Sequence, residues 1–284
     1  MVKSIATVFR RKKPMCWVRF LLVWISGIIT VAVLAYLVGF ILVKGIPHIK
    51  PSLFEATYTV ENQSLYPALV TTLIMVALTL VIAVPLGIFT AIYLVEYAKR
   101  GSRPVRWIRM TAETLAGIPS IVFGLFGYIF FAAWLGWGKS ILAGCFTLAI
   151  MILPLIMRTT EESLKSIPDS YREGSFALGA GKLRTVFRII LPASMPGIFA
   201  GIILAVGRIV GETAALVFTI GSVIQIPKNL FSQGRTLALH VYQLSSQGHH
   251  RNEAYATAVI LLVVVIGINL LASRIERRFR TSNK

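Results

Sequence analysis

The sequence predicts an all-α membrane protein with six transmembrane helices and both ends on the cytoplasmic side. The first observation is composition: 56% of the 284 residues are hydrophobic and only 14% are charged, which is far outside the range of a soluble domain. The second is the presence of six apolar runs that are long enough to cross a bilayer of about 30 Å. The third is that Lys and Arg are concentrated in every second segment that joins these runs.

The six runs define the expected spans. Five of them contain no charged residue, and the sixth, Ala193–Ser222, contains Arg208 and Glu212. The five uncharged runs are Phe20–Val43, Ala68–Val95, Thr114–Gly138, Ser140–Met157 and Ala254–Ser273.

The distribution of positive charge predicts the orientation. Of the 29 Lys and Arg, 22 lie before the first span, between spans two and three, between spans four and five, or after the sixth. Such a bias places these segments, and both termini, in the cytoplasm. The net charge of +18 therefore reflects topology and attraction to anionic lipid, not nucleic-acid binding. We expect a multi-pass plasma-membrane protein with basic cytoplasmic ends (1–19 and 274–284) around one transmembrane domain (20–273).

Two connections on the cytoplasmic side carry distinct patterns. Residues 99–110 are strongly basic and are expected to form a short loop against the lipid headgroups. Span three follows, with Pro119 as a break near its inner end. Span four ends at Arg158, where a continuing helix would pair Arg158 with Glu162 at i,i+4, and Glu161 lies at i+3.

The cytoplasmic loop 158–192 is the long polar interruption in the second half of the chain. The residues Asp169–Leu178 predict one short helix, with Pro168 near its start and Gly179 at its end. A second short helix is expected over Leu183–Ile190, before Pro192. We call these two helices the bracket. They lie at the membrane surface, where another protein can bind them.

Arg208 and Glu212 are the chemically informative pair. At 1.5 Å per residue, Arg208 is expected about halfway along its span, with Glu212 one turn nearer the outside. A charge at that depth costs a few kcal/mol and indicates a functional site, although a structural ion pair between helices is the alternative. The planar guanidinium suits an oxyanion because it donates two parallel hydrogen bonds. Glu212 is expected to hold that group in position, or to accept a proton from hydrogen phosphate.

A resemblance to a known family begins in the cytoplasmic loop. Its spacing E-x5-G-x9-I-x-L-P resembles the coupling loop of ABC importer permeases, which docks on a separate ATPase. Gly174 and Ser175 stand where that loop usually has two alanines, and both are small enough for close packing. The residues that match the spacing are Glu173, Gly179, Ile189, Leu191 and Pro192.

Three further stretches extend the resemblance from about span two through span six. They are LAGIPSIVFG (115–124), RTTEESL (158–164) and GETAALVFT (211–219), and with the loop they resemble the A-type permease subunits of bacterial phosphate ABC importers. The resemblance implies a type I importer permease fold and inward transport of inorganic phosphate. It implies a sister permease, two copies of an ABC ATPase and an external phosphate-binding protein as partners. The residues it assigns to transport are Arg158, Arg208 and Glu212.

Several other function classes fit the sequence less well. The string nearest a P-loop has Phe176 in place of its first glycine and Leu183 in place of Ser or Thr, so ATP hydrolysis is expected on a partner. No catalytic dyad or metal cluster emerges, so we expect neither an enzyme nor a cofactor. The alternatives that stay open are a permease for another oxyanion such as sulfate or molybdate, an ion-coupled secondary transporter, and a membrane scaffold that signals phosphate status.

Overall fold

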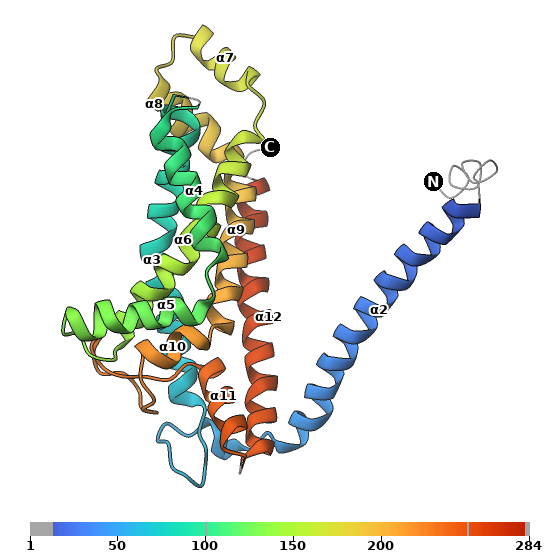
Figure 1. Cartoon of the computed structure of the whole chain (residues 1–284), viewed down its shortest axis with the longest axis vertical. Helices are drawn as coiled ribbons and strands as arrows, with labels where there is room; N and C mark the ends of the chain where they lie inside the picture. Colours follow the sequence, from blue (N-terminus) through green and yellow to red (C-terminus); the bar gives the residue numbers. More distant parts are fainter. Residues whose placement is uncertain (1–13, 100, 249, 282–284) are drawn as a thin grey trace.

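The computed structural model describes residues 14–99, 101–248 and 250–281, and the elements in these ranges are helices (Figure 1). Five of them are long and apolar enough to cross a membrane, and a bent pair supplies a sixth span. The six-helix prediction is therefore confirmed by length and composition. Of the two basic ends expected at 1–19 and 274–284, residues 1–13 and 282–284 lie outside the described residues. The five spans are Trp17–His48, Tyr66–Tyr97, Ile141–Lys165, Lys182–Gly211 and Arg251–Arg274.

Three long helices form the centre of the bundle: α3 (Tyr66–Ile92), α6 (Ile141–Lys165) and α9 (Leu191–Gly211). Many of the best-buried side chains of the main core belong to α3 and α6, such as Met75, Leu148 and Ile152. Helix α12 (Arg251–Thr281) packs along α9. Gly87 in α3 lets the two central helices approach closely, because a Cβ there would lie 2.7 Å from the Ile156 side chain. Small residues serve this purpose in membranes, where helices gain little from hydrophobic burial against each other.

The third span is broken, so the run expected over Thr114–Gly138 is not one continuous helix. The basic segment expected to be a loop forms α4 (Arg103–Gly117), and the chain then turns by 102° into a second helical piece, Ser120–Trp134. That piece consists of α5 (Ser120–Gly127) and the π-helical η5 (Tyr128–Trp134). Ile118 and Pro119 are both extended at the corner, because a proline ring disfavours helical backbone in the residue before it. Figure 1 shows α5 lying across the bundle.

The bracket formed by the two short helices after α6 differs from prediction in its second half. The first helix is confirmed as α7 (Ser170–Ala177). The second is not a separate helix: α8 (Lys182–Thr185), η6 (Val186–Ile190) and α9 form one membrane span. Pro192 directly follows the π-helical η6, in which the Leu191 amide bonds the Val186 carbonyl five residues back. Such a π-helical turn adjusts the backbone locally, so the helix continues through a residue that has no N–H. The second arm of the bracket is therefore a rigid extension of the helix that carries Arg208.

Helix α2 (Pro14–Gly45) leans away from the bundle (Figure 1). Its most apolar stretch has no buried residue. Only its end touches α12: the Phe40 and Tyr255 rings stack edge to face at 5.9 Å, and Gly45 lies against the Tyr255 carbonyl. A helix that is apolar all round, yet packs on its own chain at one end alone, needs lipid or another subunit to cover it.

The segments at the end opposite α7 are short helices and loops. They include α10 (Ala214–Thr219), α11 (Leu237–Gln247), η2 (Ile46–His48) and η3 (Pro51–Phe54). Helix α11 packs against α12. Its His240 is fully buried, with Nδ1 3.4 Å from an Arg235 nitrogen. Burial, followed by the nearby Arg235 charge, lowers the pKa of His240 to about 4, so this histidine is neutral at neutral pH.

The crossing of α5 and α10 supplies a test of the fold. A Cβ on Gly124 would lie 2.7 Å from the Ala215 Cα and 2.8 Å from its carbonyl oxygen. Because both obstacles are backbone, we expect Gly124→Ala to destabilise the purified protein by about 1–3 kcal/mol. The measurement is the thermal unfolding midpoint in detergent.

The matched control is Gly117→Ala at the end of α4, where a Cβ would meet no atom within 4 Å. Its midpoint should stay close to that of the wild type. Equal losses in both variants would show that the α5–α10 crossing is not the tight contact described.

Candidate functional site

A cavity of about 380 Å³ opens between α4, α6 and α9, and seven charged residues line it. Basic residues from three helices line it together with three glutamates, so ionic groups surround a space of small-molecule size. The basic residues are Arg109, Arg158, Lys165 and Arg208, and the acidic ones are Glu113, Glu161 and Glu162. The structure thus brings together two of the three predicted transport residues, Arg158 and Arg208.

Glu161 is the buried anion of this cavity. Its side chain is only 9% exposed, and its Oε1 lies 2.7 Å from Arg109 Nη2 and 2.6 Å from Lys165 Nζ. Arg109 belongs to α4, whereas Glu161 and Lys165 belong to α6. A carboxylate removed from water is stabilised by such short charge-assisted bonds. Glu161 therefore links α4, the helix that precedes the 102° corner, to the central helix α6.

Arg158 is held much more loosely. Its Nε lies 3.2 Å from Glu162 Oε1, and the two side chains are 70% and 67% exposed. The predicted i,i+4 pair is confirmed, but the i+3 neighbour Glu161 bonds other cations instead. An exposed pair of this kind contributes about 0–1 kcal/mol. Arg158 can exchange Glu162 for another anion at little cost.

Arg208 and Glu212 are separated by the end of their helix. Helix α9 ends at Gly211, so Arg208 lies in its last turn and not halfway along a span, and Glu212 is extended. The Glu212 carboxylate accepts a hydrogen bond of 3.1 Å from the Ala215 amide and so caps α10. Since an i,i+4 contact requires a continuous helix, the expected pairing of Arg208 with Glu212 is wrong. Among the described residues, Arg208 has no ion-pair partner within 4 Å, and Glu212 does not line the cavity.

The bracket that carries the coupling pattern lies at one end of the bundle, where α7 is labelled (Figure 1). Helix α7 ends in a left-handed glycine, Gly179, with φ +79°. The Gly179 amide bonds the Phe176 carbonyl at 2.9 Å, and the Ala180 amide bonds the Ser175 carbonyl at 3.1 Å. These two bonds form a Schellman motif, which favours glycine at this position. The small residue expected to pack closely does so: Ser175 is buried, and its hydroxyl lies 2.8 Å from that of Thr185.

The outer surface of the bracket is apolar and accessible. Glu173 is exposed on α7, and Leu178, just before Gly179, is 90% exposed. Ile189 and Leu191 instead pack against a small core that includes Val186 and Ile190. Exposed apolar patches of this kind mark protein–protein contact sites. The large exposed apolar side chains on the bracket are Tyr171, Phe176, Leu178, Leu183 and Phe187.

Sequence reasoning missed three residues that the structure makes prominent. Arg109 appears in the sequence only as part of a basic connection, and Glu96 and Arg172 only as isolated charges. Glu96 and Arg172 form a buried ion pair of 2.7 Å between the end of α3 and α7. The one available signal was that Glu96 directly follows an uncharged apolar run. In the described part of the chain, no group of three or more His, Cys, Asp or Glu is arranged to hold a metal ion.

Comparison with known proteins assigns these features to a family. Residues 83–281 match the family described as "Binding-protein-dependent transport system inner membrane component". A protein of Mycobacterium tuberculosis named "Phosphate transport system permease protein PstA 1" is 39% identical over 214 residues, covering 74% of this chain and 70% of that protein. The protein named PstA of Haemophilus influenzae is 32% identical over 255 residues, covering 87% and 88%.

Solved structures support the same fold. A chain of a bacterial alginate ABC transporter aligns with a TM-score of 0.70 and 16% identity, over 92% of this chain and 94% of that one. A chain of the MetNI methionine ABC transporter, in an inward-facing conformation, aligns with a TM-score of 0.61 and 22% identity, over 76% and 94%. At these identities the likeness shows the fold alone.

Glu161, which Arg109 and Lys165 share, provides a test of the ion pairs in the cavity. Replacing Glu161 with Gln removes the charge that Arg109 and Lys165 share, so we expect a loss of about 1–3 kcal/mol in the free energy of unfolding. Glu162→Gln breaks only an exposed pair and is expected to cost less than about 1 kcal/mol. Thermal unfolding of both variants in the same detergent compares these costs. A midpoint for Glu161→Gln equal to that of Glu162→Gln would contradict the assignment of Glu161 as the buried anchor.

Proposed function

The chain belongs to the family of binding-protein-dependent transport system inner membrane components, and from that membership we propose that it is the permease subunit of an ATP-driven importer of inorganic phosphate. As a member of this family it is a multi-pass inner-membrane transport subunit and not itself an enzyme. The observation that carries the substrate proposal is the cavity in which Arg158 and Arg208 meet from two different helices. The relatives named as phosphate transport permeases point to the same substrate.

The state of these two arginines suits a transient anion site. Arg208 has no counter-ion among the described residues, and Arg158 has only an exposed one. A phosphate ion in the cavity can contact both guanidinium groups, and each of them can donate two parallel hydrogen bonds to the phosphate oxygens. Arg158 gives up little when it leaves Glu162 and can return to that carboxylate when phosphate departs, so the anion can be exchanged. A transport site must release its substrate, so moderate affinity is an advantage.

Energy is proposed to come from two copies of a separate ABC ATPase, one of which docks on the bracket of this chain. The exposed apolar side chains from Tyr171 to Phe187 give such a partner a surface to grip. Motion there reaches the cavity through α9, because the second arm of the bracket and Arg208 share one span. Helix α2 begins, and α12 ends, toward the α7 end of the molecule (Figure 1). With the positive-inside bias, this arrangement supports a cytoplasmic bracket and cytoplasmic termini.

A sister permease is the proposed partner within the membrane. Arg158 and Glu162 line the cavity and are still about two-thirds exposed (70% and 67%), so this chain alone does not close it. The unpacked α2 offers an apolar surface to the same partner. The complete path therefore forms between two subunits, with an external phosphate-binding protein delivering the substrate. Because that protein sets much of the selectivity, Glu212 at the far end of α9 is proposed as a residue of the path and not as a determinant of substrate choice.

Uptake of radiolabelled phosphate tests the function and the arginines together. In cells that lack this chain, the wild type should restore uptake that excess sulfate does not inhibit. Arg208→Gln and Arg158→Gln should each lower uptake about tenfold or more, since hydrogen bonds to a charged group are worth about 1.5–3 kcal/mol. Arg106→Gln is the matched control, because Arg106 is an exposed cation on α4 outside the cavity.

Two results would overturn parts of this proposal. Sulfate competing fully with phosphate would favour a permease for another oxyanion. Normal uptake by Arg208→Gln at equal membrane abundance would remove Arg208 from the path and support a scaffold or a purely structural role.

Gly179 tests the docking of the ATPase. An alanine at φ +79° costs about 1–2 kcal/mol and disturbs the turn after α7, so Gly179→Ala should reduce the amount of partner ATPase that co-purifies. Gly181→Ala is the control, because Gly181 has a negative φ of −71° and open space around it. Uptake that runs normally with no ATPase bound would instead support an ion-coupled secondary transporter.

A further inference from the structure

We propose that Arg172 and Glu96 form a latch that makes α7, the end of α3 and the end of α6 move as one body. This inference rests on the proposed function, because it explains how force applied by an ATPase to α7 reaches the cavity. Arg172 is in this account a positioning residue that touches neither substrate nor nucleotide. The latch is the pair itself together with the two backbone carbonyls that Arg172 holds, those of Leu164 and Ile167.

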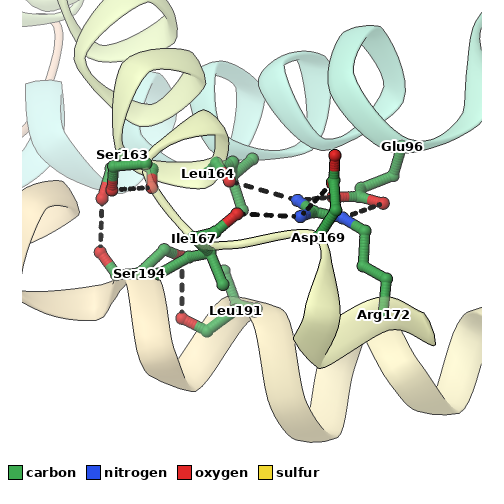
Figure 2. Close-up of polar contacts among 9 residues, drawn as sticks. Glu96, Ser163, Leu164, Ile167, Asp169, Arg172, Leu191 and Ser194 are labelled. Carbon is green, nitrogen blue, oxygen red and sulfur yellow. Dashed lines mark hydrogen bonds and ion pairs between the residues drawn. The ribbon is translucent and has the colours of Figure 1, made fainter. Parts of the chain in front are cut away.

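The geometry of the latch uses every nitrogen of one guanidinium (Figure 2). Arg172 Nη2 and Nε donate to Glu96 Oε1 at 2.7 and 3.1 Å. Nη2 also donates to the Leu164 carbonyl at 3.1 Å, and Nη1 donates to the Ile167 carbonyl at 3.0 Å. A planar fork can satisfy these acceptors together, whereas a lysine ammonium on a flexible stem cannot.

Burial decides which of its acidic partners Arg172 depends on. The Arg172 and Glu96 side chains are 15% and 7% exposed, so water can replace either partner only in small part. The second acidic neighbour, Asp169, lies 3.1 Å from Nη1 but is 69% exposed. Solvent replaces Asp169 far more readily than Glu96. The link between α7 and α3 therefore depends on one carboxylate.

The three segments that meet at Arg172 lead to the cavity. Leu164 is in the same last turns of α6 as Glu161 and Glu162, and its carbonyl is fixed by the latch. Glu96 is in η4 (Tyr93–Tyr97), the continuation of α3, which packs along α6. One residue before Leu164, the Ser163 hydroxyl donates to the Ser194 carbonyl of α9 at 2.7 Å (Figure 2). Displacement of α7 is thus passed to both helices that carry Arg158 and Arg208.

Without the latch, the connection between α7 and α6 is a short turn. The chain leaves α6 at Ser166 and re-enters a helix at Ser170, with Pro168 between them. Such a turn can flex at its few free dihedral angles and absorb a small movement of α7. The pair is a better candidate for transmission than for stability, because buried ion pairs add little net stability over neutral replacements.

The test is phosphate transported per ATP hydrolysed by the complete importer in liposomes. Arg172→Lys keeps the charge and loses the fork, and Glu96→Gln keeps the shape and loses the charge. We expect both to retain bound ATPase and basal ATP hydrolysis, while transport per ATP falls at least about fivefold. The double variant Arg172→Gln with Glu96→Gln leaves no isolated buried charge, so it should fold where a single variant does not, and it should be equally uncoupled. Asp169→Asn is the matched control and should keep the wild-type ratio.

A second readout separates this inference from the proposed substrate. The external binding protein is expected to stimulate ATP hydrolysis, and this signal reaches the ATPase through the same bracket without any movement of phosphate. The latch variants should lose this stimulation. If the wild type moves no phosphate, the proposed function fails, and this stimulation still decides the role of the latch. An unchanged ratio together with unchanged stimulation in the latch variants, or an equal loss in Asp169→Asn, would overturn the inference.

Discussion

The need to neutralise buried carboxylates organises the half of this protein that holds the cavity and the bracket. Glu96 and Glu161 are 7% and 9% exposed, and each is met by cations from another helix. An unpaired charge at such a position costs several kcal/mol, so the cations are obligatory and the helices that bear them are fixed in place. Glu161 thereby sets the position of α4 beside α6, and Glu96 sets the position of α7 at the ends of α3 and α6. The cavity and the bracket are both consequences of these two anchors.

The same principle distinguishes the residues that can act on a substrate from those that hold the structure. Arg109 and Arg172 are committed to buried glutamates. Arg158 shares an exposed carboxylate, and Arg208 has no ion-pair partner among the described residues. The two uncommitted arginines face one cavity, which is the arrangement that a passing anion requires. The committed arginines supply the rigidity against which that anion can be bound and then released.

Much of the fold follows from the sequence, because uncharged runs of bilayer length leave few alternatives. Four spans appear where hydropathy places them, the fifth is displaced to Lys182–Gly211, and α7 ends at the glycine that its pattern requires. Hydropathy cannot distinguish a straight span from two helices with a 102° corner, since Ile118 and Pro119 are themselves apolar. It also placed Arg208 by counting residues along an unbroken helix, whereas the helix ends at Gly211. Glu96 and Arg172 are 76 residues apart, and no local pattern in the sequence links them.

A structure of the assembled importer with phosphate bound tests the central claim most directly. The account predicts phosphate in the cavity between α4, α6 and α9, with its oxygens about 2.7–3.2 Å from guanidinium nitrogens of both Arg158 and Arg208. Arg158 should then have released Glu162, while Arg109 and Lys165 remain on Glu161. Phosphate bound elsewhere along the path, with Arg158 still paired to Glu162 and Arg208 facing away, would contradict it.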